Sequence, residues 1–274
     1  MKKTFYLLCL FCAVGIVYAQ ELKKIDNCSM LFIYNYMFCE EHKNPESIKG
    51  FEMTLEVGKL YSRFSDSNKR YTDSIFALHA NTPPERALAV FLQTSGVSTH
   101  SFSNYYIFKN YPSSGKTTFL ANHAYGDAHQ VEEELEFNWK IDNDATAVIL
   151  GLNCKKATCS YAGRDYEAWF APEIPISDGP YKFSGLPGLI VQIQDSDKEH
   201  MFDLREIKKV NKPMYMYFSR KAYVKTSAAG YVKALEATKI PLIEQLNSMT
   251  SDDPSVIPRA VARVKRENNF IERY

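Results

Sequence analysis

Alternation of apolar and polar residues is the clearest pattern in this chain, and it predicts β-strands. Along residues 131–141 (VEEELEFNWKI), most odd positions are apolar and the even positions are polar or charged. A strand with one buried face has this period of two. We expect a turn at residues 142–144 (DND), followed by a further strand.

Four other segments have strand character. Residues 28–39 (CSMLFIYNYMFC) are apolar and rich in aromatic side chains, a composition typical of strands. Residues 160–170 (SYAGRDYEAWF) form another strand candidate. In residues 189–194, apolar and polar side chains alternate. A polar turn (SDKE) follows, and residues 200–207 (HMFDLREI) form the second strand of a hairpin. Consecutive hairpins of this kind predict antiparallel pairing.

Helices are expected at fewer places. Thr82, Pro83 and Glu85 form a helix start, with Thr as N-cap, Pro in the first turn and Glu three residues on. Residues 220–239 and 258–268 also have helical patterns, and the second carries four basic residues that we interpret as a solvated face. The predicted fold class is α+β, dominated by a strongly twisted antiparallel β-sheet of half-barrel-like shape with a few helices.

The N-terminal 19 residues (MKKTFYLLCLFCAVGIVYA) have the pattern of a secretory signal peptide. Lys2 and Lys3 precede a short apolar stretch, and small residues stand before the expected cleavage after Ala19. The alternative, an uncleaved membrane anchor, needs ~20 apolar residues. We therefore expect export, with residues 20–274 as a single domain and no transmembrane span. Cleavage leaves a net charge of about −1, which gives no indication of a nucleic-acid partner.

Four cysteines remain after cleavage, and an oxidising compartment makes disulfides the default expectation. Four cysteines allow three connectivities, and a structural zinc site is the alternative. If residues 28–39 form one strand, its end cysteines are ~36 Å apart at ~3.3 Å per residue, too far for a disulfide. The pair at 154 and 159 requires a hairpin between them. The disulfide candidates are Cys28, Cys39, Cys154 and Cys159.

Pro and Gly are concentrated between Pro172 and Gly188, where neither a regular strand nor a regular helix can form. Pro187 and Gly188 fit the two central positions of a type II turn, in which the third residue has a positive φ. The aromatic residues of this loop are too apolar to lie in water. They are expected either to plug the core at the end of the sheet or to line an apolar ligand cavity.

The segment GRDYEAWFAPEIPISDGPYKFSGLPGLI, residues 163–190, resembles the signature of the GLPGLI family, exported proteins of Gram-negative bacteria with no known function. Weaker similarity extends over most of the mature chain. The resemblance implies export, to the periplasm or the outer cell surface, and a β-rich fold. It implies no reaction and no catalytic residue. The matching positions are Arg164, Trp169, Pro175, Gly179, Pro180, Phe183, Gly185, Leu186, Pro187, Gly188, Leu189 and Ile190.

Residues that could carry chemistry are few. GxSxG, HExxH and P-loop patterns are missing from the sequence. Arg164 fits either an anchor for a carboxylate or phosphate or, as we prefer, a structural ion pair. His123, Asp127 and His129 would share a face of an extended strand and form the candidate metal site. Gly126 favours a turn there, which would separate them.

We therefore expect a non-enzymatic binding or carrier module for an apolar ligand, working without a cofactor. The alternatives are a structural protein of the envelope that docks a partner through the Pro- and Gly-rich loop, and a metal-binding protein or hydrolase. The expected partners are thus an apolar ligand or an envelope protein.

Overall fold

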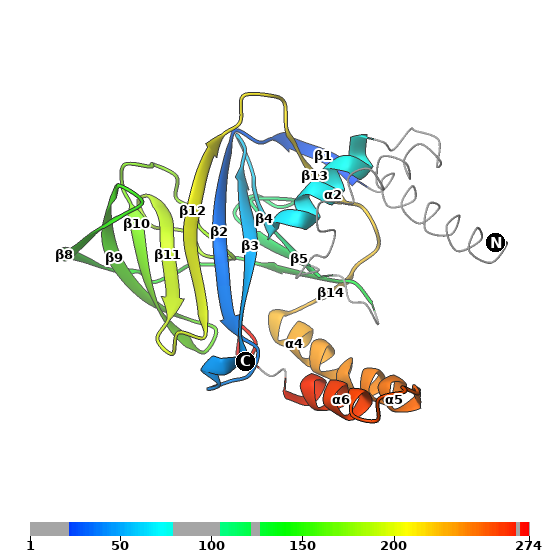
Figure 1. The fold of residues 1–274 in the computed structure, drawn as a ribbon. Coiled ribbons are helices and arrows are strands. Elements are labelled where there is room, and N and C mark those ends of the chain that lie inside the picture. Colours follow the sequence, from blue (N-terminus) through cyan, green and yellow to red (C-terminus); the bar gives the residue numbers. More distant parts are fainter. Residues whose placement is uncertain (1–21, 79–104, 122–126, 267–268, 274) are drawn as a thin grey trace.

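The computed structural model describes residues 22–78, 105–121, 127–266 and 269–273, and within them the fold is mainly β, as predicted (Figure 1). Twelve of the described strands form one sheet in the order β14-β7-β6-β5-β4-β3-β2-β12-β11-β10-β9-β8. All neighbours pair antiparallel except β14 and β7, which are parallel. The sheet is not closed.

The first half of the described chain contributes β1 (Leu22–Asn27), β2 (Met30–Cys39), β3 (Ile48–Val57), β4 (Ser62–Asp66), β5 (Tyr105–Lys109), β6 (Thr117–Ala121) and β7 (His129–Glu133). The second half contributes β8 (Lys140–Ile149), β9 (Leu152–Tyr161), β10 (Arg164–Ala171), β11 (Leu189–Asp195), β12 (His200–Lys209), β13 (Tyr215–Ser219) and β14 (Val224–Thr226). The strands β1 and β13 pair separately, as a small two-stranded sheet.

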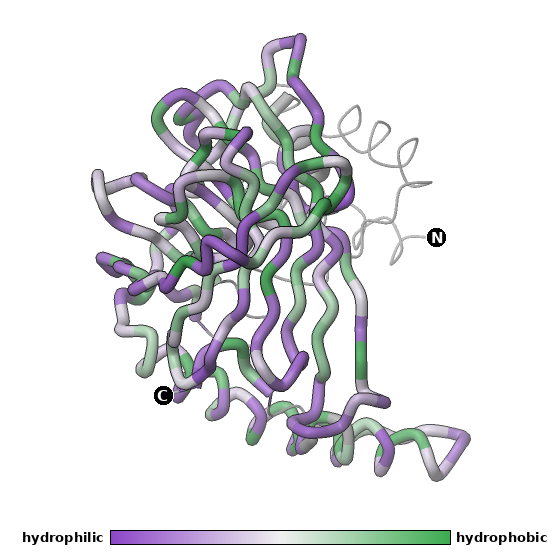
Figure 2. Tube along the Cα trace, turned by 90° about the vertical axis from the view of Figure 1, so that its left-hand side faces the viewer, coloured by the Kyte–Doolittle hydropathy of each residue, from purple (hydrophilic) through white to green (hydrophobic). Residues whose placement is uncertain are grey.

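The helices are η1 (Pro45–Ser47), α2 (Ser67–Leu78), α4 (Ala228–Ala237), α5 (Lys239–Ser248) and α6 (Val256–Arg266). The predicted helix at 220–239 begins only at Ala228, because residues 224–226 pair with β7 and the Ser227 side chain caps the helix by accepting a hydrogen bond from the Gly230 amide. The predicted helix at 258–268 corresponds to α6. The predicted helix start at residues 82–85 lies outside the described residues. Figure 2 shows α4 to α6 crossing the lower end of the strands. Among the described helices, we find none whose length and apolar character would let it cross a membrane.

Two strand predictions need correction. The predicted strand at 131–141 breaks after β7, and residues 134–139 leave the sheet. Phe137 and Trp139 pack against Phe183, and the Trp139 indole N–H donates to the Ser184 carbonyl, 2.8 Å away. The predicted turn at 142–144 lies within β8, as an irregularity in its pairing with β9. Tertiary contacts therefore replace the strand that the alternation predicts.

The strand candidate at 160–170 is a hairpin instead. β9 ends at Tyr161, Ala162 and Gly163 turn the chain with positive φ, and β10 starts at Arg164. The strand predicted at 189–194 and the returning strand at 200–207 are confirmed as β11 and β12.

The loop between β10 and β11 forms part of the hydrophobic core. Tyr181, Phe183 and Leu186 are buried there with residues from both halves of the sheet. The Lys109 ammonium, on β5, donates to the Gly179 carbonyl at 2.9 Å and the Phe183 carbonyl at 2.7 Å, and pairs with Asp178. These contacts connect β5 to the loop across the inside of the sheet. Of the two arrangements expected for the aromatic residues of this loop, packing into the core is found for Tyr181 and Phe183, and Tyr181 also lines a cavity.

The expected disulfides are absent, and all four described cysteines are free and buried. Cys154 and Cys159 lie on the unbroken strand β9, so the hairpin their pairing requires does not exist. Cys28 lies two residues before β2 and Cys39 is the last residue of that strand, so the length of β2 separates them. Three strands separate β2 from β9 in the sheet order, so cysteines on these two strands are far apart. Burial also raises the pKa of the Cys28 and Cys159 thiols to about 12, which keeps them protonated. The disulfide prediction is therefore wrong for this structure.

Candidate functional site

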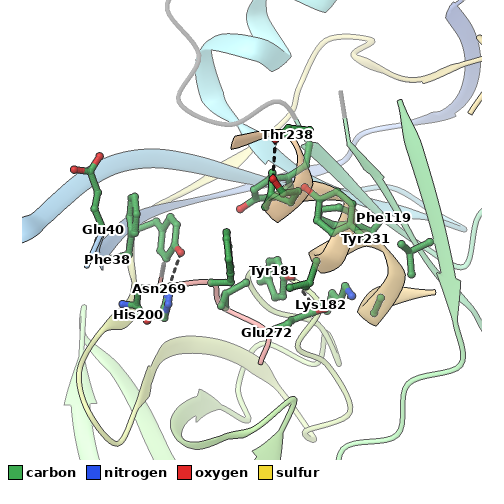
Figure 3. Close-up of a pocket in the computed structure, with 18 of the residues that line it drawn as sticks. Phe38, Glu40, Phe119, Tyr181, Lys182, His200, Tyr231, Thr238, Asn269 and Glu272 are labelled. Atoms are coloured by element: carbon green, nitrogen blue, oxygen red, sulfur yellow. Dashed lines mark hydrogen bonds and ion pairs between the residues drawn. The ribbon is translucent and has the colours of Figure 1, made fainter. Parts of the chain in front are cut away.

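A cavity of about 540 Å³ lies between the sheet and the helical layer. Figure 3 shows it with His200 and Asn269 at one end, Phe119 and Tyr231 at the other, and Lys182 and Glu272 between. Its walls come from β2, β5, β6, β7 and the start of β12, from the loop between β10 and β11, from α4 to α6, and from the C-terminal segment 269–272. The described aromatic lining residues are Tyr36, Phe38, Tyr105, Phe119, Tyr181, Tyr231 and Phe270.

The helical side of this cavity is mostly apolar, with Thr238 and Lys239 as its polar residues. Tyr231 and Leu235 on α4, Leu242 on α5 and Val264 on α6 line it, together with Ala228. Tyr231 packs edge-on against Phe119, with ring centroids 5.0 Å apart. The helices therefore direct apolar side chains toward the cavity, as an amphipathic layer over a sheet does.

A buried ion cluster forms the middle of the cavity floor. The Lys182 ammonium lies 2.5 Å from a Glu133 carboxylate oxygen and 2.6 Å from Glu272. Glu272 also accepts hydrogen bonds from the hydroxyls of Tyr161, at 2.8 Å, and Tyr181, at 2.9 Å. Burial, followed by the nearby Glu272 carboxylate, raises the pKa of Tyr181 well above its usual value, so that hydroxyl remains a donor.

His200 lies at the end of the cavity opposite Phe119 and Tyr231, and it is 1% exposed. Its Nδ1 is 2.8 Å from the Tyr36 hydroxyl, and its ring stacks with those of Tyr36 and Phe38. Burial, and then the positive charge of Arg164, lowers the pKa of His200 to about 3. The imidazole is therefore neutral at pH 7.

We expect the stability of the protein to fall below pH 6.5 because of His200. Its pKa is about 6.5 when unfolded and about 3 when folded, so between these values the unfolded chain binds one more proton. The free energy of unfolding then decreases by up to about 1.4 kcal/mol for each pH unit lost. Urea denaturation at pH 7.0 and 4.5 measures this loss. His200→Asn, which cannot titrate, should lose about 2 kcal/mol less over this interval, and equal losses in both proteins would contradict the assignment.

Arg164 lies behind the cavity, in a second buried charge cluster. One guanidinium nitrogen is 2.5 Å from Asp195 and 3.0 Å from Glu199. The other donates to the Phe270 carbonyl at 2.8 Å and to the Asn269 side chain. Burial alone would raise the pKa of Glu199, but the Lys43 amide and the Arg164 and His42 side chains lower it to about 2. Arg164 therefore acts as a structural ion-pair residue, one of the two functions considered for it.

The same C-terminal segment is held at several further points. The Tyr166 hydroxyl donates to the Ile271 carbonyl, Arg273 pairs with Glu199 at 2.6 Å, and the Arg273 amide donates to the Ala162 carbonyl. Residues 269–273 thus form a strap that is fixed by β10, by the turn between β9 and β10 at Ala162, and by the turn between β11 and β12 at Glu199. This C-terminal strap forms part of the cavity wall, and its residues carry no motif that sequence reasoning could have used.

Most of the signature residues are packed within the fold and do not line the cavity. Trp169 is half-buried on β10, opposite Lys156 and Gln192. Three positions are exposed, namely Pro175, Gly185 and Pro187. The remaining positions are buried, namely Arg164, Gly179, Pro180, Phe183, Leu186, Gly188, Leu189 and Ile190. Tyr181 and Lys182, which stand between them in the loop, are the residues of this segment that reach the cavity.

The bend at Gly188 differs from the predicted type II turn. Gly188 has a positive φ of 152°, which agrees with the expectation for that position. Its amide, however, donates to the Leu186 carbonyl two residues before it, at 2.8 Å, so the chain makes a tighter bend around Pro187.

The candidate metal residues are only partly described. His123 lies outside the described residues, Asp127 is exposed and His129 is half-buried on β7. The site they would form stays a prediction. Another acidic group within the described chain, at Asp195, Asp197 and Glu199, has two of its carboxylates paired with arginine.

Fold and cavity together define a class, an open antiparallel β-sheet protein with a mostly apolar pocket between the sheet and its helices. A family described as "Protein of unknown function (Porph_ging)" matches residues 160–192. This is the GLPGLI family, and the chain carries its signature over that segment.

Two solved structures share the fold, those of PNGF-II in space groups P21 and C2. They are 14% and 13% identical to this chain and cover 77% of it, each with a TM-score of 0.50. The match covers 34% and 33% of those chains, so this chain corresponds to about a third of PNGF-II. None of the curated proteins matches the chain.

Proposed function

We propose that this protein is an exported cell-envelope binding or carrier module that holds an apolar ligand in the cavity between the sheet and α4 to α6. The cavity itself is the observation that supports this function. Its volume of about 540 Å³ falls in the range of sites for small molecules, which are mostly apolar and largely preformed. The signal-peptide pattern of residues 1–19 supports export.

The chemistry of the walls favours an apolar ligand. Aromatic rings at Phe38, Phe119 and Phe270 and aliphatic side chains at Leu235 and Leu242 surround the space. A ligand that covers these groups removes apolar surface from water, at about 25 cal/mol for each Å². Burial of the floor residues Tyr181 and Lys182 gives the site a fixed lower wall.

Native mass spectrometry of the mature protein, purified without detergent from its own envelope, tests this function. We expect a mass above that of the bare chain, because a preformed apolar cavity retains its ligand. Leu242→Trp places an indole into the cavity from α5 and should remove the additional mass. Leu150→Trp is the matched control, since Leu150 is exposed in the turn between β8 and β9, away from the cavity. A bare chain in the wild type, or equal retention in both variants, would count against a carrier function.

Docking of a protein partner through the loop at residues 172–188 has less support. This second function requires exposed aromatic side chains, whereas Tyr181 and Phe183 are 3% and 0% exposed. A hydrolase is not favoured by a specific contact either, since the described residues that line the cavity include neither serine nor cysteine.

A further inference from the structure

The charges that face the cavity are balanced. Among the described lining residues, the side chains with charge at pH 7 are two carboxylates, Glu40 and Glu272, and two ammonium groups, Lys182 and Lys239. His200 is neutral there because burial lowers its pKa to about 3. The described lining therefore has no net charge to offer a charged ligand.

The Lys182 ammonium is fully committed to carboxylates. It is 2% exposed, and Glu133 and Glu272 lie 2.5 and 2.6 Å from it. It also lies over the rings of Phe119 and Tyr181, at 5.5 and 5.8 Å from their centroids. An anionic ligand would have to displace a carboxylate from Lys182, and Glu272, 5% exposed, would then be buried without its cation. Separating a buried ion pair in this way is strongly unfavourable.

Lys239 is also engaged. Its ammonium lies 3.1 Å from both Glu236 carboxylate oxygens and 5.2 Å from the centroid of the Phe270 ring. The pair with Glu236 is partly exposed, at 18% and 47%, and the ring face of Phe270 adds a cation–π contact. Both cations of the described lining are thus occupied by groups of the protein itself.

We propose that the cavity selects uncharged apolar molecules and rejects anionic ones, with the Lys182–Glu272 pair as the determinant of this specificity. This inference rests on the proposed binding function. A neutral ring system or acyl ester fills the space between the aromatic walls without changing any ion pair. An anion, such as a fatty acid carboxylate, loses its hydration in the cavity and gains no cation in return.

Two fluorescent probes with one ring system test the selectivity. N-phenyl-1-naphthylamine is neutral, and 8-anilino-1-naphthalenesulfonate carries the same rings and a sulfonate. We expect the neutral probe to bind the purified, ligand-stripped protein with a Kd lower by about tenfold or more, equivalent to about 1.4 kcal/mol. Leu242→Trp should weaken binding of the neutral probe, which places it in this cavity.

Glu272→Gln tests the assigned pair. The amide keeps acceptor contact with the two tyrosine hydroxyls but leaves Lys182 with only Glu133 as counter-charge. We expect the affinity for the sulfonate to rise about tenfold, while that for the neutral probe changes by less than about twofold. Glu134→Gln is the matched control, because it removes the same charge from a side chain that is 77% exposed, and it should change neither affinity.

The outcomes separate the two proposals. If the sulfonate binds the wild type as tightly as the neutral probe, and Leu242→Trp blocks both, the selectivity is refuted and the binding function stands. If Glu272→Gln folds but leaves the ratio of the two affinities unchanged, the assignment to this pair is refuted. If neither probe binds, or if Leu242→Trp does not affect their binding, the binding function itself is refuted. The ratio measured on the wild type decides the selectivity even if Glu272→Gln does not fold.

Discussion

Arg164→Met is expected to destabilise the protein by about 3 kcal/mol or more, because removing one partner of a buried ion pair leaves an uncompensated charge. Asp195 and Glu199, at 1% and 3% exposure, would both lose the guanidinium. The Phe270 carbonyl and the Asn269 side chain of the C-terminal strap would lose the hydrogen bonds that Arg164 donates, and Asn269 would keep only the one from Arg273. Urea denaturation monitored by tryptophan fluorescence measures the change.

Arg205→Met is the control for this substitution. Arg205 lies on β12 and is exposed, and surface substitutions of this kind usually change stability by about 0.5 kcal/mol or less. Arg164→Lys keeps the charge but not the two-pronged geometry, so an intermediate loss is expected. Equal stability of Arg164→Met and Arg205→Met would show that the charge cluster does not hold the strap.

Gly188→Ala is expected to cost about 3 kcal/mol or more, through two separate effects. A Cβ at this position would overlap the carbonyl oxygen of Ala171 and lie 2.7 Å from its carbonyl carbon, with Pro172 Cα at 2.9 Å. Backbone atoms cannot move aside as a flexible side chain can, and such overpacking costs about 1–3 kcal/mol. The positive φ of 152° adds strain of about 1–3 kcal/mol for a residue with a Cβ.

Gly115→Ala separates these two effects. Gly115 also has a positive φ, 77°, but a Cβ there would meet no atom within 4 Å. It should therefore lose only about 1–2 kcal/mol, from the backbone conformation alone. Thermal unfolding resolves the difference, because 1 kcal/mol corresponds to about 2–4 °C in a protein of this size. A Gly188→Ala variant with the melting temperature of Gly115→Ala would refute the close approach.

Local sequence predicted elements wherever the local pattern and the tertiary packing agreed. The sequence predicts β2 from its apolar and aromatic composition, β11 from its alternation, and β12 as the strand that follows a polar turn. The 131–141 segment shows the same alternation, but the contacts of Phe137 and Trp139 with Phe183 take it out of the sheet. Alternation reports which side chains are buried, and it does not report whether they are buried on a sheet or against a loop.

Prediction of the candidate site was more limited. Tyr181 is one of the aromatic loop residues expected to plug the core or to line a cavity, and a structural ion pair is one of the two alternatives given for Arg164. Lys182, His200 and Glu272 carried no sequence signal, because each is ordinary in its own segment and acquires its function from residues far along the chain. Glu272 meets Lys182 only when the C-terminal strap returns to the loop at residues 172–188.

The sequence by itself determined the β-rich class, the antiparallel hairpins, the family signature at residues 163–190 and the need of the aromatic loop for apolar cover. These features depend on local periodicity, turn chemistry and composition. Only the tertiary structure decided that the described cysteines stay unpaired, that the loop packs into the hydrophobic core, and that helices and the C-terminal strap line a cavity beside the sheet. The reason is that distances between side chains in different strands are set by sheet order and curvature, which short-range patterns do not encode.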